Sequence, residues 1–163
     1  MFLRLIGEER AAQAYTGACP FVDVPDWCRK YVGYAYSRGY AAGVGPTAGG
    51  QPAFGPERTI GAGEYVTFLL RALGYRDSGD APDFTWQNVL PRAAELGVIT
   101  PGEYTLLTGG RFLRAHVAYL SYFGLDAACK TGGSLLSALS ASGALDGAAV
   151  SAVRSGVTVA RIS

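Results

Sequence analysis

The sequence is poor in the residues that most often build metal and catalytic sites. Its 163 residues include a single histidine, His116, and three cysteines, Cys19, Cys28 and Cys129. One histidine excludes a histidine-based triad and a multi-histidine metal site, and the cysteines lack the spacing of zinc ligands. Cys19 and Cys28 either form a disulfide or stay as buried free thiols. We therefore expect no metal and no cofactor.

Net charge and long apolar runs are also nearly absent. The 14 Lys and Arg residues balance the 13 Asp and Glu residues, which gives a formal net charge of +1. Because no basic residues cluster, we expect no nucleic-acid partner. No apolar run approaches the roughly 18–20 residues of a membrane span. Residues 1–6 lack the features of a signal peptide and resemble a helix end, so we expect the chain to start inside a longer precursor.

The motifs of common enzyme classes are missing as well. The sequence has no Gly-x-Ser-x-Gly and no phosphate-binding loop. Its carboxylates are dispersed, and no two stand out as a glycosidase pair. Residues 43–45, Gly-Val-Gly, lie in a long loop without the strand-to-helix frame of a dinucleotide site. We therefore expect a protein that is not an enzyme.

What the sequence does contain is a strong amphipathic helix within Gly55–Gly74. Apolar residues recur there with helical spacing, namely Tyr65, Phe68, Leu69, Ala72 and Leu73. Gly61 and Glu64 form a weak capping box at its start, and Gly74 ends it. Similar glycine-terminated endings occur at residues 2–7 and 119–124. Three such endings indicate an internal repeat of roughly 50–70 residues.

Further helices are predicted at residues 26–38, 85–96, 112–123, 134–142 and 147–154. Trp27, Tyr31, Tyr34 and Ala35 form the apolar face of the first, and Trp86 lies on that of the second. Glycine- and proline-rich loops, chiefly residues 41–58 and 98–111, separate the helices, and residues 157–163 are left extended. The predicted fold class is mainly α, because helix–loop–helix repeats with aromatic faces must pack on one another.

Three short motifs follow one another in a characteristic order. Phe21–Trp27 reads F-V-D-V-P-D-W, Phe54–Pro56 reads F-G-P, and Ile60–Glu64 opens the central helix. This order resembles the S-layer homology family, whose repeat runs from F-x-D-V-x-x-W through F-x-P to I-T-R-A-E. The match is looser over residues 83–124, where Phe84–Trp86 opens the unit and Phe112–His116 takes the place of I-T-R-A-E.

The resemblance implies a helical module of the cell surface. Family members commonly form a pseudo-threefold bundle of three repeats that holds a secreted protein to secondary cell-wall polysaccharide, often through a pyruvylated sugar. The expected division of this chain is residues 1–19 as the tail of an upstream repeat, 20–76 as one repeat, 77–126 as a degenerate repeat, and 127–163 as a short helical hairpin with an extended tail. The expected location is extracellular, at the cell wall.

The expected glycan-binding residues are Arg114, Trp27, Trp86 and Asp26. Only Arg114 matches the arginine of the family motif, because Ala62 occupies that position in the first repeat. An arginine near a helix N-terminus suits a carboxylate-bearing sugar, and a tryptophan offers a flat face to the sugar ring. The alternatives are core anchoring for the tryptophans, helix capping for Asp26 and a surface salt bridge for Arg114.

A second function also fits the sequence. Degenerate repeats rich in Tyr and Phe can pack subunit against subunit, so copies of the chain itself are possible partners in a surface layer or filament. The absence of an arginine in the first motif favours this structural role over wall anchoring. The two functions differ in their partner, which is a cell-wall polysaccharide in one case and the same chain in the other.

Overall fold

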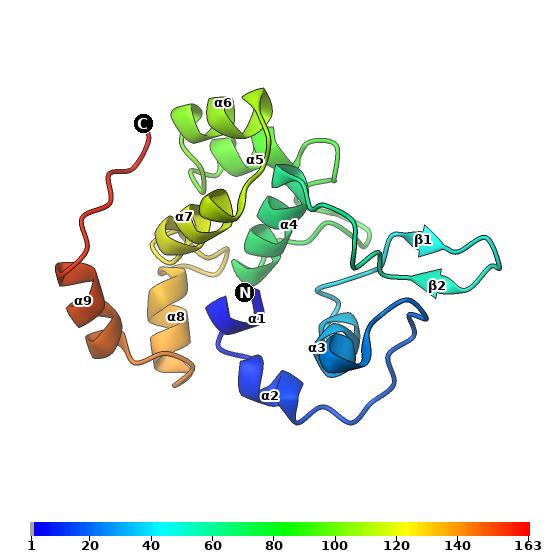
Figure 1. Cartoon of the computed structure of the whole chain (residues 1–163). Coiled ribbons are helices and arrows are strands. Elements are labelled where there is room, and N and C mark those ends of the chain that lie inside the picture. The colour runs from blue at the N-terminus through cyan, green and yellow to red at the C-terminus, as the bar shows by residue number, and fades with distance from the viewer. Residues whose placement is uncertain (1) are drawn as a thin grey trace. The chain divides into compact units, whose positions relative to one another are not determined.

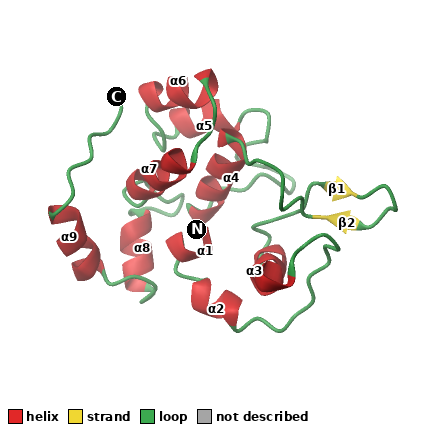
Figure 2. Cartoon of the chain, in the orientation of Figure 1, coloured by secondary structure: helices red, strands yellow, loops and turns green. Residues whose placement is uncertain are grey.

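The computed structural model describes residues 2–163 and is mainly helical, which confirms the predicted fold class (Figures 1 and 2). The helices are α1 (Phe2–Leu5), α2 (Glu9–Gln13), α3 (Asp26–Ser37), α4 (Ala62–Ala72), α5 (Val89–Glu95), α6 (Pro101–Gly109), α7 (Arg114–Gly124), α8 (Leu135–Ala141) and α9 (Gly147–Ser155). Two short strands, β1 (Gly45–Pro46) and β2 (Pro52–Ala53), pair in antiparallel fashion. Within residues 2–163, no helix has the length and apolar character that crossing a membrane requires.

The chain divides into two compact units, with the boundary between Thr59 and Ile60. Unit 1 contains α1, α2, α3 and the β1–β2 hairpin, and unit 2 contains α4 to α9. The boundary falls inside the stretch 20–76 that the sequence suggests as one repeat. The compact units therefore differ from the sequence repeats, whose limits stay a prediction.

The core of unit 1 lies against α3. Phe21, Val24, Cys28 and Val32 are buried together, and Cys19 packs against them. All three cysteines of the chain are free thiols. Of the two alternatives for Cys19 and Cys28, the structure therefore has the unbridged one.

The inward face of α3 differs from the predicted one. Cys28, Val32 and Gly33 are buried, whereas Trp27 is exposed and Tyr31, Tyr34 and Ala35 are only partly buried. The cause is the close approach of the preceding segment, because a Cβ placed on Gly33 would lie only 3.3 Å from the Cβ of Cys19. This segment covers the small-residue side of the helix, so the predicted aromatic face is wrong.

The β1–β2 hairpin lies within residues 41–58, where the sequence predicts no regular element. Val44 N–H donates to the Ala53 carbonyl at 2.9 Å, and Thr47 N–H donates to the Gln51 carbonyl at 2.7 Å. Val22 N–H donates to the Pro52 carbonyl at 3.1 Å, which attaches the hairpin to the segment before α3. Two-residue strands are too short to show an alternating pattern, so the prediction is wrong at this point.

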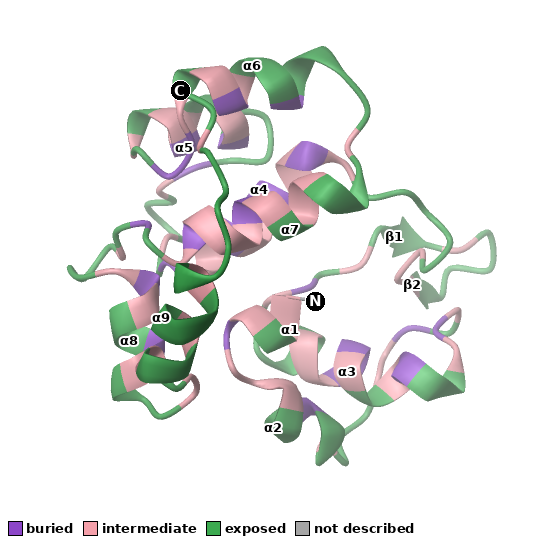
Figure 3. Ribbon diagram, turned by 60° about the vertical axis from the view of Figure 1, so that its left-hand side comes forward, coloured by how far each residue is buried: buried purple, intermediate pink, exposed green. Residues whose placement is uncertain are grey.

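Helix α4 carries the core of unit 2. Val66, Leu69, Leu70 and Leu73 are at most 1% exposed, and Figure 3 shows buried positions along α4. Its Tyr65 hydroxyl lies 2.5 Å from the Ser121 hydroxyl of α7, so a polar contact accompanies the apolar packing of the two helices.

Glycine has two different roles in the three aligned helix endings. Gly7 and Gly74 have φ angles of 73° and 89°, the left-handed conformation that terminates a helix, as predicted. Gly124 is the last residue of α7 and is buried, and it is not among the glycines with a positive φ. A Cβ at Gly124 would lie 2.8 Å from Leu69 Cδ1. Helix α7 therefore ends at Gly124 as predicted, but this glycine lacks the left-handed conformation and instead allows α7 and α4 to approach closely.

Helices α5 and α6 also depart from expectation. Helix α5 begins at Val89 rather than at Thr85, which places Pro91 in the first turn, where a missing N–H breaks no helical hydrogen bond. Helix α6 occupies most of the stretch 98–111 that was expected to be turns. Thr100 caps it by accepting a hydrogen bond from Glu103 N–H at 3.0 Å, with Pro101 at the first helical position.

The C-terminal part agrees with the prediction of two short helices and an extended tail. Helix α9 has no buried residue. Arg154 attaches it to α7 by donating to the Asp126 carboxylate at 2.7 Å and to the Tyr122 carbonyl at 2.5 Å. The Arg154 guanidinium also lies 4.5 Å from the centre of the Tyr122 ring. Polar contacts therefore provide much of the attachment of α9.

Candidate glycan-binding surface

Trp27 is the most exposed large apolar side chain of unit 1. It is the second residue of α3 and is 81% exposed, so the alternative in which it anchors the core is wrong. Asp26 precedes it with a side chain that is 99% exposed and 3.3 Å from Arg29. Asp26 accepts no capping bond from α3 among the described residues. Trp27 and Asp26 are thus neighbouring exposed side chains at the start of α3, and Asp26 pairs with Arg29.

The segment before Trp27 is fixed by a carboxylate. Asp23 accepts hydrogen bonds from Phe54 N–H at 2.8 Å and Gly55 N–H at 2.7 Å. These two amides, with Phe54 first, lower the pKa of the Asp23 carboxyl below its ordinary value. The Phe21 and Phe54 rings lie 5.6 Å apart. The F-x-D-V and F-x-P motifs of the sequence therefore contact each other directly.

Arg29 fixes the same segment from the helix side. Its guanidinium donates to the Phe21 carbonyl at 3.3 Å and to the Val24 carbonyl at 2.8 Å. The backbone leading to Trp27 is thus bound by Asp23 on one side and by Arg29 on the other. A rigid backbone lowers the entropy lost when an exposed ring binds a ligand.

Trp86 repeats this arrangement in unit 2. It is 78% exposed and lies in the turn before α5, so its predicted inward orientation is wrong. The nearby Asp83 accepts hydrogen bonds from Arg76 N–H at 2.8 Å and from Lys130 Nζ at 2.6 Å. Lys130 and then the Arg76 amide lower the pKa of the Asp83 carboxyl. Arg92 donates to the Asp83 carbonyl at 3.2 Å, so an arginine also binds the backbone of this segment.

The two segments agree in their order of residues. Each has an aspartate whose carboxylate accepts at least one backbone N–H, then a buried apolar residue, then an exposed tryptophan. The buried residue is Val24 in unit 1 and Phe84 in unit 2, exposed by 2% and 1% respectively. In both segments a nearby apolar side chain fills the core while the tryptophan remains exposed.

Arg114 is exposed at the first position of α7. Among the described residues, no hydrogen bond or ion pair of its side chain is found, so the surface salt bridge considered as an alternative is not formed there. His116 caps the N-terminus of the same helix, because its Nδ1 accepts a hydrogen bond from Leu113 N–H at 3.2 Å. Glu64 does the same at the start of α4, accepting from Gly61 N–H at 2.8 Å. His116 therefore caps the start of α7 as Glu64 caps the start of α4.

The four predicted site residues are divided between the two units. Trp27 and Asp26 belong to unit 1, and Trp86 and Arg114 belong to unit 2. Within unit 2, no hydrogen bond, ion pair or ring contact joins Trp86 to Arg114 among the described residues.

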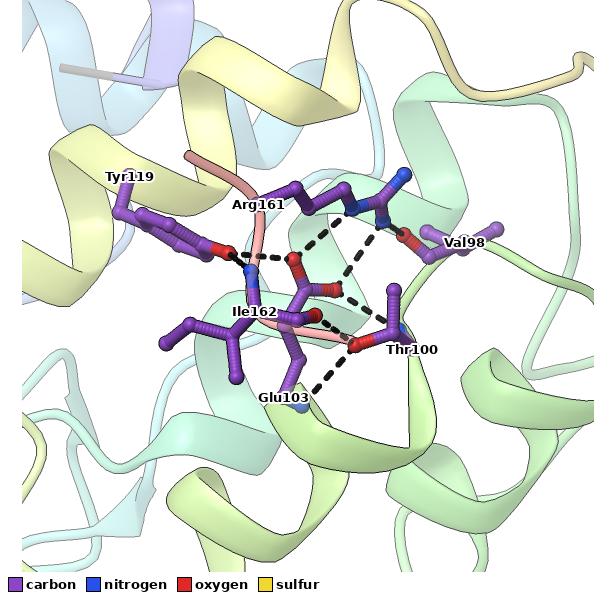
Figure 4. A network of polar contacts seen from close by, with 6 residues as sticks. All are labelled: Val98, Thr100, Glu103, Tyr119, Arg161 and Ile162. Carbon is purple, nitrogen blue, oxygen red and sulfur yellow. Dashed lines mark hydrogen bonds and ion pairs between the residues drawn. The ribbon is translucent and has the colours of Figure 1, made fainter. Parts of the chain in front are cut away.

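A buried polar network in unit 2 was missed by the sequence analysis. The Glu103 side chain is 1% exposed and faces Arg161, whose Nε and Nη2 lie 2.9 and 3.0 Å from its two oxygens (Figure 4). The Tyr119 hydroxyl donates to Glu103 at 2.8 Å, and Thr100 N–H donates to it at 2.8 Å. The helix-start motif at Thr100 and Glu103 is visible in the sequence, but nothing there connects it to Arg161.

The charge state of Glu103 follows from these contacts. Burial by itself raises the pKa of the Glu103 carboxyl, but Arg161, the Thr100 amide and the Tyr119 hydroxyl together outweigh it and lower the pKa. The same ion pair raises the pKa of Arg161. Glu103 is therefore ionised at neutral pH and paired, which suits a structural role.

The described residues offer no metal site, because no three His, Cys, Asp or Glu side chains gather among residues 2–163. What the surface offers is two exposed tryptophans on fixed backbone and one exposed arginine at a helix start. Flat rings and a guanidinium can bind sugar faces and carboxylates without catalysing a reaction. Comparison with family models, with curated proteins and with solved structures finds no match for this chain.

Proposed function

We propose that the chain is a non-catalytic, extracellular module that binds an anionic cell-wall polysaccharide, such as one carrying pyruvylated sugars, and so anchors a secreted protein to the wall. Trp27 and Trp86 contact sugar rings, Arg114 binds a carboxylate, and Asp26 accepts hydrogen bonds from sugar hydroxyls. The observation that carries the proposal is the exposure of both tryptophans on fixed backbone.

Exposed tryptophans at corresponding positions need a physical reason. A tryptophan buries more apolar area than any other side chain, so leaving two of them in water forgoes a large contribution to folding. In each unit a smaller neighbour fills the core, and the backbone before the tryptophan is fixed by an aspartate and an arginine. A ligand that covers the rings regains this apolar contact, and a sugar face has the flat shape to do so.

Arg114 supports the same function through charge. Its exposed guanidinium is the first residue of α7, where backbone N–H groups and the helix dipole also favour an anion. A carboxylate bound there would contact Arg114 in a charge-assisted pair worth roughly 1.5–3 kcal/mol. That energy corresponds to about a tenfold to hundredfold change in affinity.

Self-assembly through aromatic interfaces is the less favoured candidate. Among the described residues, the large apolar side chains that are clearly exposed include the two tryptophans and Tyr36, but no phenylalanine. Most Tyr and Phe rings are used inside the chain, as with Phe21 against Tyr36 and Tyr119 against Phe123. The aromatic surface left for a partner is therefore small and concentrated at the tryptophans.

A binding titration with purified wall polysaccharide tests the proposal. We expect Arg114→Ala to weaken binding at least tenfold, and Arg111→Ala, which removes the same charge from a neighbouring exposed position, to leave it nearly unchanged. Removing the pyruvyl groups from the polymer should weaken binding to the wild-type chain and have little further effect on Arg114→Ala. If the folded wild-type chain does not bind the polymer, the proposal is wrong.

A further inference from the structure

The C-terminal arm, residues 146–163, is attached to unit 2 by two arginines. Arg154 binds Asp126 and the Tyr122 carbonyl of α7, and Arg161 binds Glu103 of α6. None of the residues of the arm is buried, and Val153, Val157 and Val159 remain exposed. The arm therefore buries little apolar surface when it is docked.

The site that receives Arg161 is buried, in contrast to the exposed arm. Glu103 is almost completely buried and already accepts hydrogen bonds from Thr100 N–H and the Tyr119 hydroxyl, both of which belong to the body of unit 2. These two neutral donors leave the negative charge unpaired unless a cation enters. In the docked arm Arg161 supplies this positive charge, and its guanidinium makes two of the contacts to the carboxylate.

The docked end of the arm is also recognised through its backbone. Arg161 Nη2 donates to the Val98 carbonyl at 2.9 Å, and Ile162 N–H donates to the Tyr119 hydroxyl at 2.7 Å. The Thr100 hydroxyl donates to the Ile162 carbonyl, and a Cβ on Gly102 would overlap Ser163. The site therefore fits an extended Arg-Ile-Ser segment closely, whichever copy of the chain supplies it (Figure 4).

Two short segments flank α9 and connect the arm to the rest of unit 2. Residues 142–145 join α8 to α9 and include Gly143 with a φ of 72°. Residues 157–160 are exposed and extended between α9 and Arg161. Within residues 142–145, Ala144 and Leu145 are half-buried, and their amides donate to the Leu139 carbonyl at 2.9 and 3.2 Å. Because the arm itself makes mainly polar contacts with the rest of unit 2, it can be exchanged between identical copies at low cost.

From this geometry we propose that the C-terminal arm is exchanged between copies of the chain, so that Arg161 of one copy binds Glu103 of another. The partner is a second copy because the arm carries the one segment known to fit the site. In dilute solution the arm docks on its own body, since short tethers give effective concentrations in the millimolar range. Crowding of the chain at a surface raises the concentration of neighbouring arms towards that range and links the copies.

The test uses two full-length variants that complement each other. Glu103→Gln keeps the arm but weakens the site, and Arg161→Gln keeps the site but weakens the arm. We expect a 1:1 mixture to form a heterodimer at least tenfold more tightly than either variant self-associates, measured by sedimentation with folding checked by circular dichroism. Mixing Glu103→Gln with the double variant should give no heterodimer. A mixture of folded variants that stays monomeric at about 1 mM would overturn the proposal.

A measurement on the wild-type chain covers the case in which a variant does not fold. Two differently isotope-labelled samples are mixed at about 1 mM, and contacts between the Ile162 methyl groups of one copy and the Tyr119 ring of the other are sought by filtered NMR. Such contacts support exchange, and contacts confined to single chains refute it. Because Trp27, Trp86 and Arg114 are unchanged throughout, the result is independent of the proposed glycan binding.

Discussion

The Glu103→Gln substitution probes the buried ion pair of unit 2 with little change of shape. It removes the charge that Arg161 contacts at 2.9 and 3.0 Å while keeping the size of the side chain. Hydrogen bonds to charged groups contribute about 1.5–3 kcal/mol each, and disrupting a buried pair costs about 3–5 kcal/mol when one charge is left behind. Arg161 can move into water, since its side chain is 31% exposed. We therefore expect a loss of about 2–3 kcal/mol.

The matched control is Glu95→Gln, which makes the same chemical change on the surface. Glu95 pairs with Arg92 at 2.8 Å, but its side chain is 63% exposed. Exposed pairs contribute about 0–1 kcal/mol, so this variant should lose much less stability. Urea unfolding followed by circular dichroism measures both free energies of unfolding at neutral pH. Equal losses for Glu103→Gln and Glu95→Gln would refute the reasoning.

The pH dependence gives an independent check with a definite sign. The pKa of Glu103 is lowered in the folded chain from its ordinary value of 4.5. A lowered pKa stabilises the folded state above the ordinary value, and this contribution is lost as the pH falls through the folded pKa. The stability difference between wild type and Glu103→Gln should therefore be full at pH 7 and shrink progressively below about pH 4.5. A difference that stays constant down to acid pH would contradict the assignment.

Three further predictions concern other contacts. Asp23→Asn should lower the hydrogen-exchange protection of the Phe54 and Gly55 amides. In the wild-type chain the same protection should fall as the pH drops through the lowered pKa of Asp23; unchanged protection in the variant would count against this contact. Gly124→Ala should destabilise by about 1–3 kcal/mol because its Cβ meets Leu69, whereas Gly109→Ala, with nothing within 4 Å, should not; equal thermal shifts would show the packing argument to be wrong. Tyr119→Phe should cost about 1–3 kcal/mol in urea unfolding by removing a donor to Glu103, and a neutral effect would contradict it.

Helical periodicity identified the mainly α fold and most of the helices. It failed at the tryptophans because periodicity gives the relative direction of side chains but not which side is covered. In α3 the covered side is set by the approach of the segment around Cys19, which is allowed by Gly33. In unit 2 the buried place next to Trp86 is taken by Phe84, so the larger ring remains outside.

Contacts between segments that are distant in the chain could not be predicted from the sequence. Glu103 and Arg161 are 58 residues apart, and their pairing depends on how the arm returns to α6. The capping signal at Thr100 was present, but two glycines and two further threonines in residues 100–109 weaken the helical pattern that would have predicted α6. By contrast, the exposed position of Arg114 is local to a helix start and could be inferred from its motif.

Quenching of the intrinsic fluorescence tests the central claim most directly, because Trp27 and Trp86 are the two tryptophans of the chain. Both are largely exposed, so acrylamide should quench their emission efficiently in the free protein. If the rings bind wall polysaccharide, saturating polymer should reduce quenching and shift the emission to shorter wavelength, with Trp27→Phe and Trp86→Phe each losing part of the change. Quenching that is unaltered by polymer at any concentration would contradict the proposed function.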